Sequence, residues 1–371
     1  MSKIRTWLNE SIYLAPLSPA CKMCAQGAKL VVLITGQCPA SCFYCPLSFE
    51  KGGTDRIFAD EWELDHENDT EKLIQEATYI DAKGAGITGG DPLIVWQRTC
   101  KYISLLKDAF GSSFHIHLYT SGLQNAEHID DLVDAGLDEI RFHPTPSHWS
   151  NMQNSSLCSV IEHTASLAVD TALEIPILPE KKQEILALIQ WGNQQELQWI
   201  NMNELEFSER NAEALTAKHC TVKDDISAAV KGSQECAYDI LERVANKDLD
   251  IGVHYCSSSF KDGVQLTNRI KRRARHVAQP HEIISDDGTL LKGVVYSSHE
   301  SLLHLRARMQ QEFQIADEHI VVNSKKQRIE LAPWILETIA THLKEKGYDC
   351  FLVEEYPTAD GLEVERVPLP L

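Results

Sequence analysis

Three closely spaced cysteines are the most informative feature of this sequence. Cys38, Cys42 and Cys45 stand at i, i+4 and i+7, directly after a short apolar and β-branched run, 29–35. Cysteine thiolates are the usual protein ligands of iron–sulfur clusters, and a cubane cluster contains four irons. Three thiolates therefore leave one iron open to another ligand, in the way that a catalytic zinc site keeps an open position. The competing interpretation is a structural zinc or cluster site that takes its fourth ligand from elsewhere in the chain.

A glycine-rich tetrapeptide follows the next predicted strand, 84–88. It consists of Gly89, Gly90, Asp91 and Pro92. Glycines let the backbone approach a ligand closely, and a carboxylate beside them suits an ammonium group. Taken alone the tetrapeptide could be an ordinary turn, but it comes one strand–helix unit after the cysteine loop.

Together the two motifs resemble those of the radical S-adenosylmethionine (radical SAM) superfamily. Its signature is CxxxCxΦC, where Φ is aromatic, and Tyr44 holds the Φ position here. Its GGEP motif, which contacts the amino group of S-adenosylmethionine (SAM), corresponds to 89–92, with Asp91 in place of glutamate. The resemblance implies a [4Fe-4S] cluster on the three cysteines and SAM bound at the open iron. It further implies that the reduced cluster cleaves SAM to a 5′-deoxyadenosyl radical, which abstracts hydrogen from a substrate.

Six strand–helix units between residues 29 and 207 must position these motifs. Strands that alternate with helices indicate a parallel α/β sheet with right-handed crossovers. An open doubly wound sheet and a barrel both fit this rhythm, and the resemblance favours a partial (β/α)6 TIM-like barrel. Ligands of such folds lie at the carboxyl ends of the strands. Further SAM contacts are therefore expected among polar residues at or near these ends, namely Thr120, Ser121, Arg141, His143 and Glu174.

A second group of candidate metal ligands is dispersed along the chain. Cys21 and Cys24 form a CxxC pair before the first strand, and His254 and Cys256 lie in and after a short predicted strand. These four residues could form a Cys3His zinc site or hold a second iron–sulfur cluster. The obstacle is that Cys24 starts at the floor of the barrel, whereas Cys256 emerges at the opposite end if its strand runs parallel. The site requires an antiparallel strand there or a long excursion of the N-terminal segment. The alternative is a reduced pair and a separate free thiol.

The rhythm of the sequence divides the chain into four segments. We expect a cysteine-containing extension at 1–28 and the radical SAM core at 29–210. A helical extension with Cys256 and a basic run is expected at 211–280, and a small α+β unit at 281–371.

Composition excludes several classes of protein. The 371 residues carry a formal net charge of −19, which argues against a nucleic-acid partner because phosphate binding depends on Lys and Arg. The sequence has no window of about 18 uncharged apolar residues, so no membrane span is predicted. The start has no apolar signal region, so a cytoplasmic location is expected. The odd count of 11 cysteines also fits a disulfide scaffold poorly.

The substrate stays open on this reasoning. The sequence looks most like archaeal relatives of the pyruvate formate-lyase activating enzymes, which implies a reductant such as ferredoxin or flavodoxin. A protein, a peptide or a small metabolite is the favoured substrate, while RNA modification and methyl transfer are alternatives. The alternative to an enzyme is a non-catalytic iron–sulfur protein with a redox or scaffold role.

Overall fold

Two compact units make up the structure. The computed structural model describes residues 3–225 and 227–370, and its contacts separate Met1–Leu266 from Thr267–Leu371. The first unit takes in the segments expected at 1–28 and 29–210, together with most of the third.

An 11-stranded sheet forms the framework of the first unit. Seven neighbouring strands in it run parallel. In spatial order these are β3 (Lys29–Thr35), β6 (Gly84–Gly89), β7 (His115–Thr120), β8 (Glu139–Phe142), β9 (Asp170–Pro176), β10 (Trp199–Asn203) and β11 (Gly252–Cys256). The strand expected near 250–255 is thus a seventh parallel strand, because β11 pairs with β10 in the same direction.

Antiparallel strands flank the parallel set at both edges. Beside β11 lie β2 (Ile12–Leu14) and β1 (Arg5–Thr6), and beside β3 lie β4 (Ile57–Ala59) and β5 (Trp62–Leu64). Within the described residues the sheet runs from β1 to β5 without closing on itself. The predicted partial barrel is confirmed, with one parallel strand more than the six expected.

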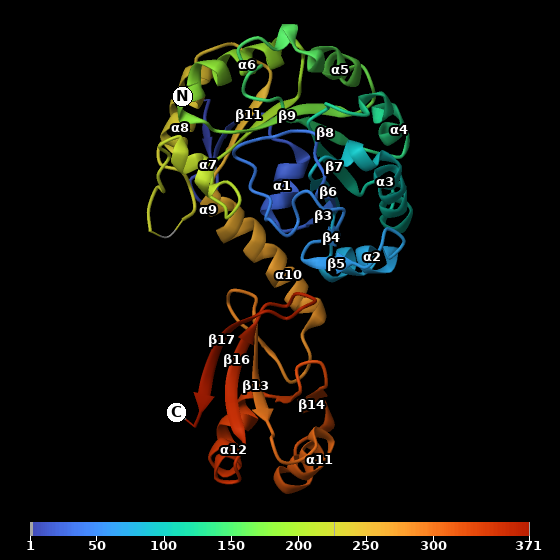
Figure 1. The fold of residues 1–371 in the computed structure, drawn as a ribbon, viewed down its shortest axis with the longest axis vertical. Helices are drawn as coiled ribbons and strands as arrows, with labels where there is room; N and C mark the ends of the chain where they lie inside the picture. The colour runs from blue at the N-terminus through green and yellow to red at the C-terminus, as the bar shows by residue number, and fades with distance from the viewer. Residues whose placement is uncertain (1–2, 226, 371) are drawn as a thin grey trace. The chain divides into compact units, whose positions relative to one another are not determined.

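The side chains of the parallel strands alternate between an outer face, covered by helices, and the interior of the barrel. On β7, Ile116 and Leu118 are fully buried beneath the helices, whereas His117 and Tyr119 face the interior and hydrogen-bond to each other at 2.9 Å. This period of two follows from the pleat of a strand. The helices cover the outer face (Figure 1): α2 (Thr70–Tyr79), α3 (Trp96–Phe110), α4 (Ile129–Asp134), α5 (Ser156–Ala165), α6 (Lys182–Gln194) and α8 (Ser233–Ala245). Across the described chain, no helix combines the length and apolar character needed to cross a membrane.

A short N-terminal helix lies inside the barrel. Figure 1 shows α1 (Pro19–Ala25) within the curve of the strands. Ser18 caps this helix by accepting from the backbone N–H of Ala20, and its hydroxyl donates to Glu139 of β8 at 2.7 Å. The helix therefore lies in the lumen and is hydrogen-bonded to β8.

The second unit is a small α+β fold. Helices α11 (Leu302–Phe313) and α12 (Pro333–Glu345) pack on one face of its sheet through a common apolar core. The sheet strands are β12 (Ile283–Ile284), β13 (Leu290–Tyr296), β14 (Ile320–Asn323), β15 (Arg328–Leu331), β16 (Asp349–Glu355) and β17 (Glu363–Leu369).

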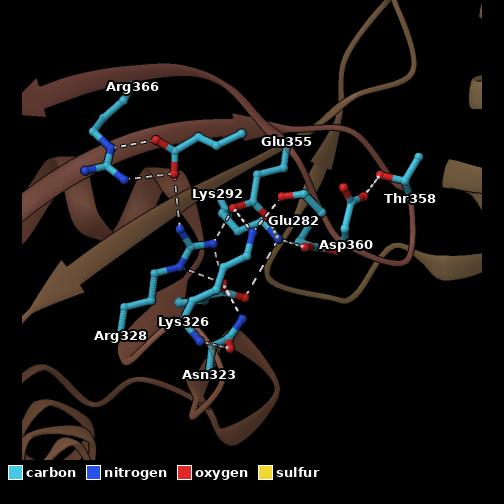
Figure 2. A network of polar contacts seen from close by, with 12 residues as sticks. Glu282, Lys292, Asn323, Lys326, Arg328, Glu355, Thr358, Asp360 and Arg366 are labelled. Carbon is cyan, nitrogen blue, oxygen red and sulfur yellow. Dashed lines mark hydrogen bonds and ion pairs between the residues drawn. The ribbon is translucent and has the colours of Figure 1, made fainter. Parts of the chain in front are cut away.

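The other face of this sheet carries a network of buried charges (Figure 2). Lys292 lies between the carboxylates of Glu282, Glu330 and Glu355. Arg328 pairs with Glu330 at 2.5 Å and also with Glu355. Because the basic and acidic groups offset one another, this face can be buried without an unpaired charge.

Candidate active site

The cysteine loop leaves the carboxyl end of β3. A hydrogen bond from the Cys45 N–H to the Cys42 carbonyl, at 3.1 Å, makes a tight turn between two of the ligands. Cys38 is exposed, and Cys42 and Cys45 are half-buried. Partial desolvation by the surrounding protein raises the pKa of the Cys38 thiol to about 11 and also raises the pKa of Cys42. Iron would supply the positive charge that keeps such thiols deprotonated. Three thiols on one accessible loop fit a [4Fe-4S] cluster with an open iron.

The glycine-rich motif is bonded to the start of this loop. Gly90 donates its N–H to the Thr35 carbonyl, and Asp91 donates its N–H to the Gln37 carbonyl, both at 2.7 Å. A Cβ on Gly90 would lie only 1.9 Å from the Gln37 oxygen. Gly89 has a φ of 129°, and a Cβ there would lie 2.2 Å from the Thr35 carbonyl oxygen. Glycine is therefore required here for close approach of two backbones, which ties the predicted SAM segment to the predicted cluster loop.

Asp91 is brought together with the two hydroxyl residues that end β7. The carboxylate is buried and accepts from Thr120 Oγ1 at 2.7 Å, from the Ser121 N–H at 3.0 Å and from the Ser121 hydroxyl. It also caps the short turn that begins at Pro92, by accepting from the Leu93 N–H at 3.1 Å. The sequence prediction placed these residues at neighbouring strand ends, and the structure adds that Asp91 is what joins those ends.

Tyr44 is fixed from two sides. Its hydroxyl lies 2.9 Å from His143 Nε2, and His143 Nδ1 lies 2.7 Å from the Glu174 carbonyl oxygen. Because that carbonyl can only accept, the imidazole proton belongs on Nδ1, and Tyr44 donates to Nε2. Asn211 donates to the Tyr44 carbonyl at 3.1 Å. Sequence reasoning missed Asn211, since a polar residue in a loop carries no pattern that marks it.

Arg141 and Glu174, expected as SAM contacts, belong to a buried network around α1. Arg141 Nε donates to Glu139 at 2.6 Å, and Nη1 donates to Glu174 at 2.7 Å. Burial opposes the charge of the guanidinium, but the two carboxylates raise the pKa of Arg141. Nη2 donates to Ser18 at 3.1 Å. These hydrogen bonds hold α1 in the lumen. Contact of Arg141 or Glu174 with SAM stays a prediction. Glu139, which sequence reasoning missed, faces the same way as Arg141 because it lies two residues earlier on β8.

The second predicted ligand set also faces the lumen. Cys21 and Cys24 lie on α1, and His254 and Cys256 lie on the inner face of β11. No three of their ligand atoms come within 4.8 Å of one another in the described part of the chain. As a metal site, this set stays a prediction.

Comparison with known proteins agrees with this geometry. The profile of the radical SAM superfamily matches residues 32–145, and that of a domain of unknown function, DUF8061, matches residues 288–369. A Methanocaldococcus jannaschii protein, provisionally named a glycyl-radical enzyme activating enzyme, is 37% identical over 100% of this chain and 96% of its own length. The chain belongs to the radical SAM superfamily.

Other similarities are confined to parts of the chain. The GTP 3′,8-cyclase of Staphylococcus carnosus is 34% identical over 107 residues, which are 29% of this chain and 31% of that protein. Streptococcus suis SuiB bound to S-adenosylmethionine superposes with a TM-score of 0.44 at 9% identity, covering 62% of this chain and 50% of SuiB. As a radical SAM enzyme, the protein is expected to hold the [4Fe-4S] cluster on Cys38, Cys42 and Cys45, and the non-catalytic alternative falls away.

Proposed function

We propose that this radical SAM enzyme is an activating enzyme that abstracts a hydrogen atom from a glycine residue of a partner protein. The observation that carries the radical chemistry is the direct bonding of the glycine-rich motif to the cysteine loop. The choice of a protein substrate rests on the full-length relative, whose name assigns it to activating enzymes of glycyl-radical enzymes.

When bound and reduced, the cluster supplies one electron that cleaves SAM to methionine and a 5′-deoxyadenosyl radical. The chain's own residues bind and orient. Gly89 and Gly90 let their backbone lie against the start of the cysteine loop, and Asp91 fixes the end of β7 beside them. Tyr44, held by His143, fixes the loop between Cys42 and Cys45.

In the proposed reaction, the radical takes a hydrogen atom from the glycine Cα. This yields 5′-deoxyadenosine and a carbon-centred glycyl radical, so one electron and one SAM are consumed for each glycine. The electron would come from a protein such as ferredoxin or flavodoxin. A small-metabolite substrate is the alternative within the same chemistry.

Anaerobic reconstitution tests the first step. Protein with cluster, chemical reductant and SAM should form 5′-deoxyadenosine, and Cys42→Ala should not. Cys158→Ser is the matched control, because Cys158 is a buried cysteine on α5, outside the loop. Wild-type protein that holds iron and binds SAM but forms no 5′-deoxyadenosine contradicts the proposal. Formation of S-adenosylhomocysteine instead would indicate methyl transfer.

The second step is tested by adding a purified glycyl-radical enzyme as substrate. The expected result is a glycyl radical signal in electron paramagnetic resonance (EPR), absent when the target glycine of the substrate protein is replaced by alanine. Deuterium from a substrate protein deuterated at the Cα of that glycine should appear in 5′-deoxyadenosine. Turnover with no deuterium transfer would refute abstraction from that glycine.

A further inference from the structure

The N-terminal segment makes the excursion that a second metal site requires. A Cβ on Gly252 would lie 1.9 Å from the Pro16 carbonyl, so the chain passes against the foot of β11 before it enters the lumen. At the other end of α1, Ala25 joins Cys256 and Phe260 in one apolar cluster. The CxxC helix therefore reaches the carboxyl end of β11, although it precedes the first parallel strand.

His254 presents an unused nitrogen to the lumen. Its Nδ1 is hydrogen-bonded to Asn201 Oδ1, and Asn201 donates its amide to Glu174 Oε1 at 2.9 Å. That donation fixes the orientation of the amide, so the imidazole proton belongs on Nδ1. His254 is 4% exposed, and its Nε2 has no hydrogen-bond partner among the described residues. Metal-binding histidines have this arrangement, with one ring nitrogen held by an oxygen and the other left for the metal.

The sulfurs of Cys21 and Cys256 receive hydrogen-bond donors. Arg141 Nη2 lies 3.4 Å from Cys21 Sγ, and Gln265 Nε2 lies 3.7 Å from Cys256 Sγ. Both cysteines are buried. Donors to sulfur favour a thiolate and tune the potential of iron–sulfur clusters. The donors to these thiols are thus of the kind found around metal-bound cysteines.

We propose that Cys21, Cys24, His254 and Cys256 bind a second metal centre through thiolate and imidazole ligands. Such ligands suit iron–sulfur clusters and zinc. In the described part of the chain, no three of these four ligand atoms lie within 4.8 Å of one another, and the same holds for Cys38, Cys42 and Cys45. This spacing favours a cluster over a single zinc ion, whose bonds of about 2.0–2.3 Å require closer ligands. The centre would lie beside α1, inside the barrel.

Metal analysis of the full chain tests this proposal. Wild-type protein, reconstituted with iron and sulfide or purified with zinc, is compared with the double variant Cys21→Ser, Cys24→Ser and with Cys256→Ala. For a second cubane we expect about eight irons in the wild type and about four in the variants. For zinc we expect about one ion per chain in the wild type and none in the variants. Equal iron and zinc contents in wild type and variants overturn the proposal.

Controls separate loss of the centre from loss of the fold. Cys236→Ser removes a buried cysteine of α8 and should leave the metal content unchanged. Should the double variant not fold, His254→Gln keeps all the thiols and should still lower the metal content. The EPR change that SAM causes at the first cluster should persist in the Cys256→Ala variant. A result that refutes the second metal centre therefore leaves the proposed function standing, and a result that refutes the proposed function leaves the second metal centre standing.

Discussion

Replacing Gly90 with alanine should separate the glycine-rich motif from the cysteine loop. The new Cβ would lie 1.9 Å from the Gln37 oxygen and 2.4 Å from its carbonyl carbon, where ordinary contact begins at 3.4 Å. The two backbones must then move apart by about 1.5 Å, since neither obstacle is a side chain that could rotate away. Both 2.7 Å hydrogen bonds, from Gly90 to Thr35 and from Asp91 to Gln37, would break.

The cost can be estimated from these contacts. Two backbone hydrogen bonds contribute about 1 kcal/mol each, and overpacking adds about 1–3 kcal/mol, so the variant should lose about 3–5 kcal/mol of stability. A misplacement of about 1 Å can lower a rate about 100-fold. We therefore expect about 100-fold slower formation of 5′-deoxyadenosine and a weaker effect of SAM on the EPR spectrum of the reduced cluster.

The matched control is Gly53→Ala in the same loop. Gly53 has a φ of 81°, and a Cβ there would meet nothing within 4 Å. Its cost should be about 1 kcal/mol of backbone strain, with the rate nearly unchanged. The reasoning is refuted if Gly90→Ala binds and cleaves SAM like the wild type, or if both variants fail equally.

Three further predictions follow from buried contacts. Asp91→Asn should cost about 2 kcal/mol and weaken SAM binding in titration calorimetry, because the Ser121 N–H loses its acceptor; an unchanged affinity would show that this carboxylate does not order the site. Gly252→Ala should loosen α1, since its Cβ would lie 1.9 Å from a backbone carbonyl of the segment before that helix; faster hydrogen exchange across α1 is the expected result, and unaltered protection would contradict it. Burial disfavours the charge of Glu330, but the charge of Lys292 and the hydrogen bonds from Arg328 hold the pKa of Glu330 well below its ordinary value. The contribution of Glu330 to stability is therefore present above about pH 4.5 and is lost as the pH falls. Glu330→Gln should cost about 3 kcal/mol at pH 7 and make the free energy of unfolding less dependent on pH in the acid range. Parallel plots of unfolding free energy against pH for variant and wild type would exclude this role.

Local patterns were sufficient to predict the cluster loop and the framework around it. Cys38, Cys42 and Cys45 lie on one loop, so their spacing alone brings them together. Parallel strands end at the same edge of a sheet, which is why Asp91 and Ser121 could be expected to be neighbours. The rhythm of strands and helices likewise predicted the parallel α/β sheet, and the resemblance to the radical SAM superfamily favoured the partial barrel over an open sheet.

Local sequence patterns could not predict contacts between segments that are far apart in the chain. Ser18 and Glu139 are separated by 121 positions, and nothing in either segment indicates that one caps a helix inside the barrel beside the other. The direction of β11 was left open because a short strand carries no mark of its pairing partner. Arg141 and Glu174 were expected at the ligand, but the interior of the barrel also needs charges that satisfy one another, and periodicity cannot distinguish the two uses.

The helix in the lumen has a kinetic consequence. Within the described residues, α1 is hydrogen-bonded to β8 and packs against the end of β11, so it obstructs an approach to the cysteine loop from the floor of the barrel. We therefore expect SAM and the proposed protein substrate to enter and leave at the carboxyl ends of the strands. A protein bound there would cover the nucleoside, so SAM should bind before the protein substrate, and 5′-deoxyadenosine should leave only after that substrate has dissociated.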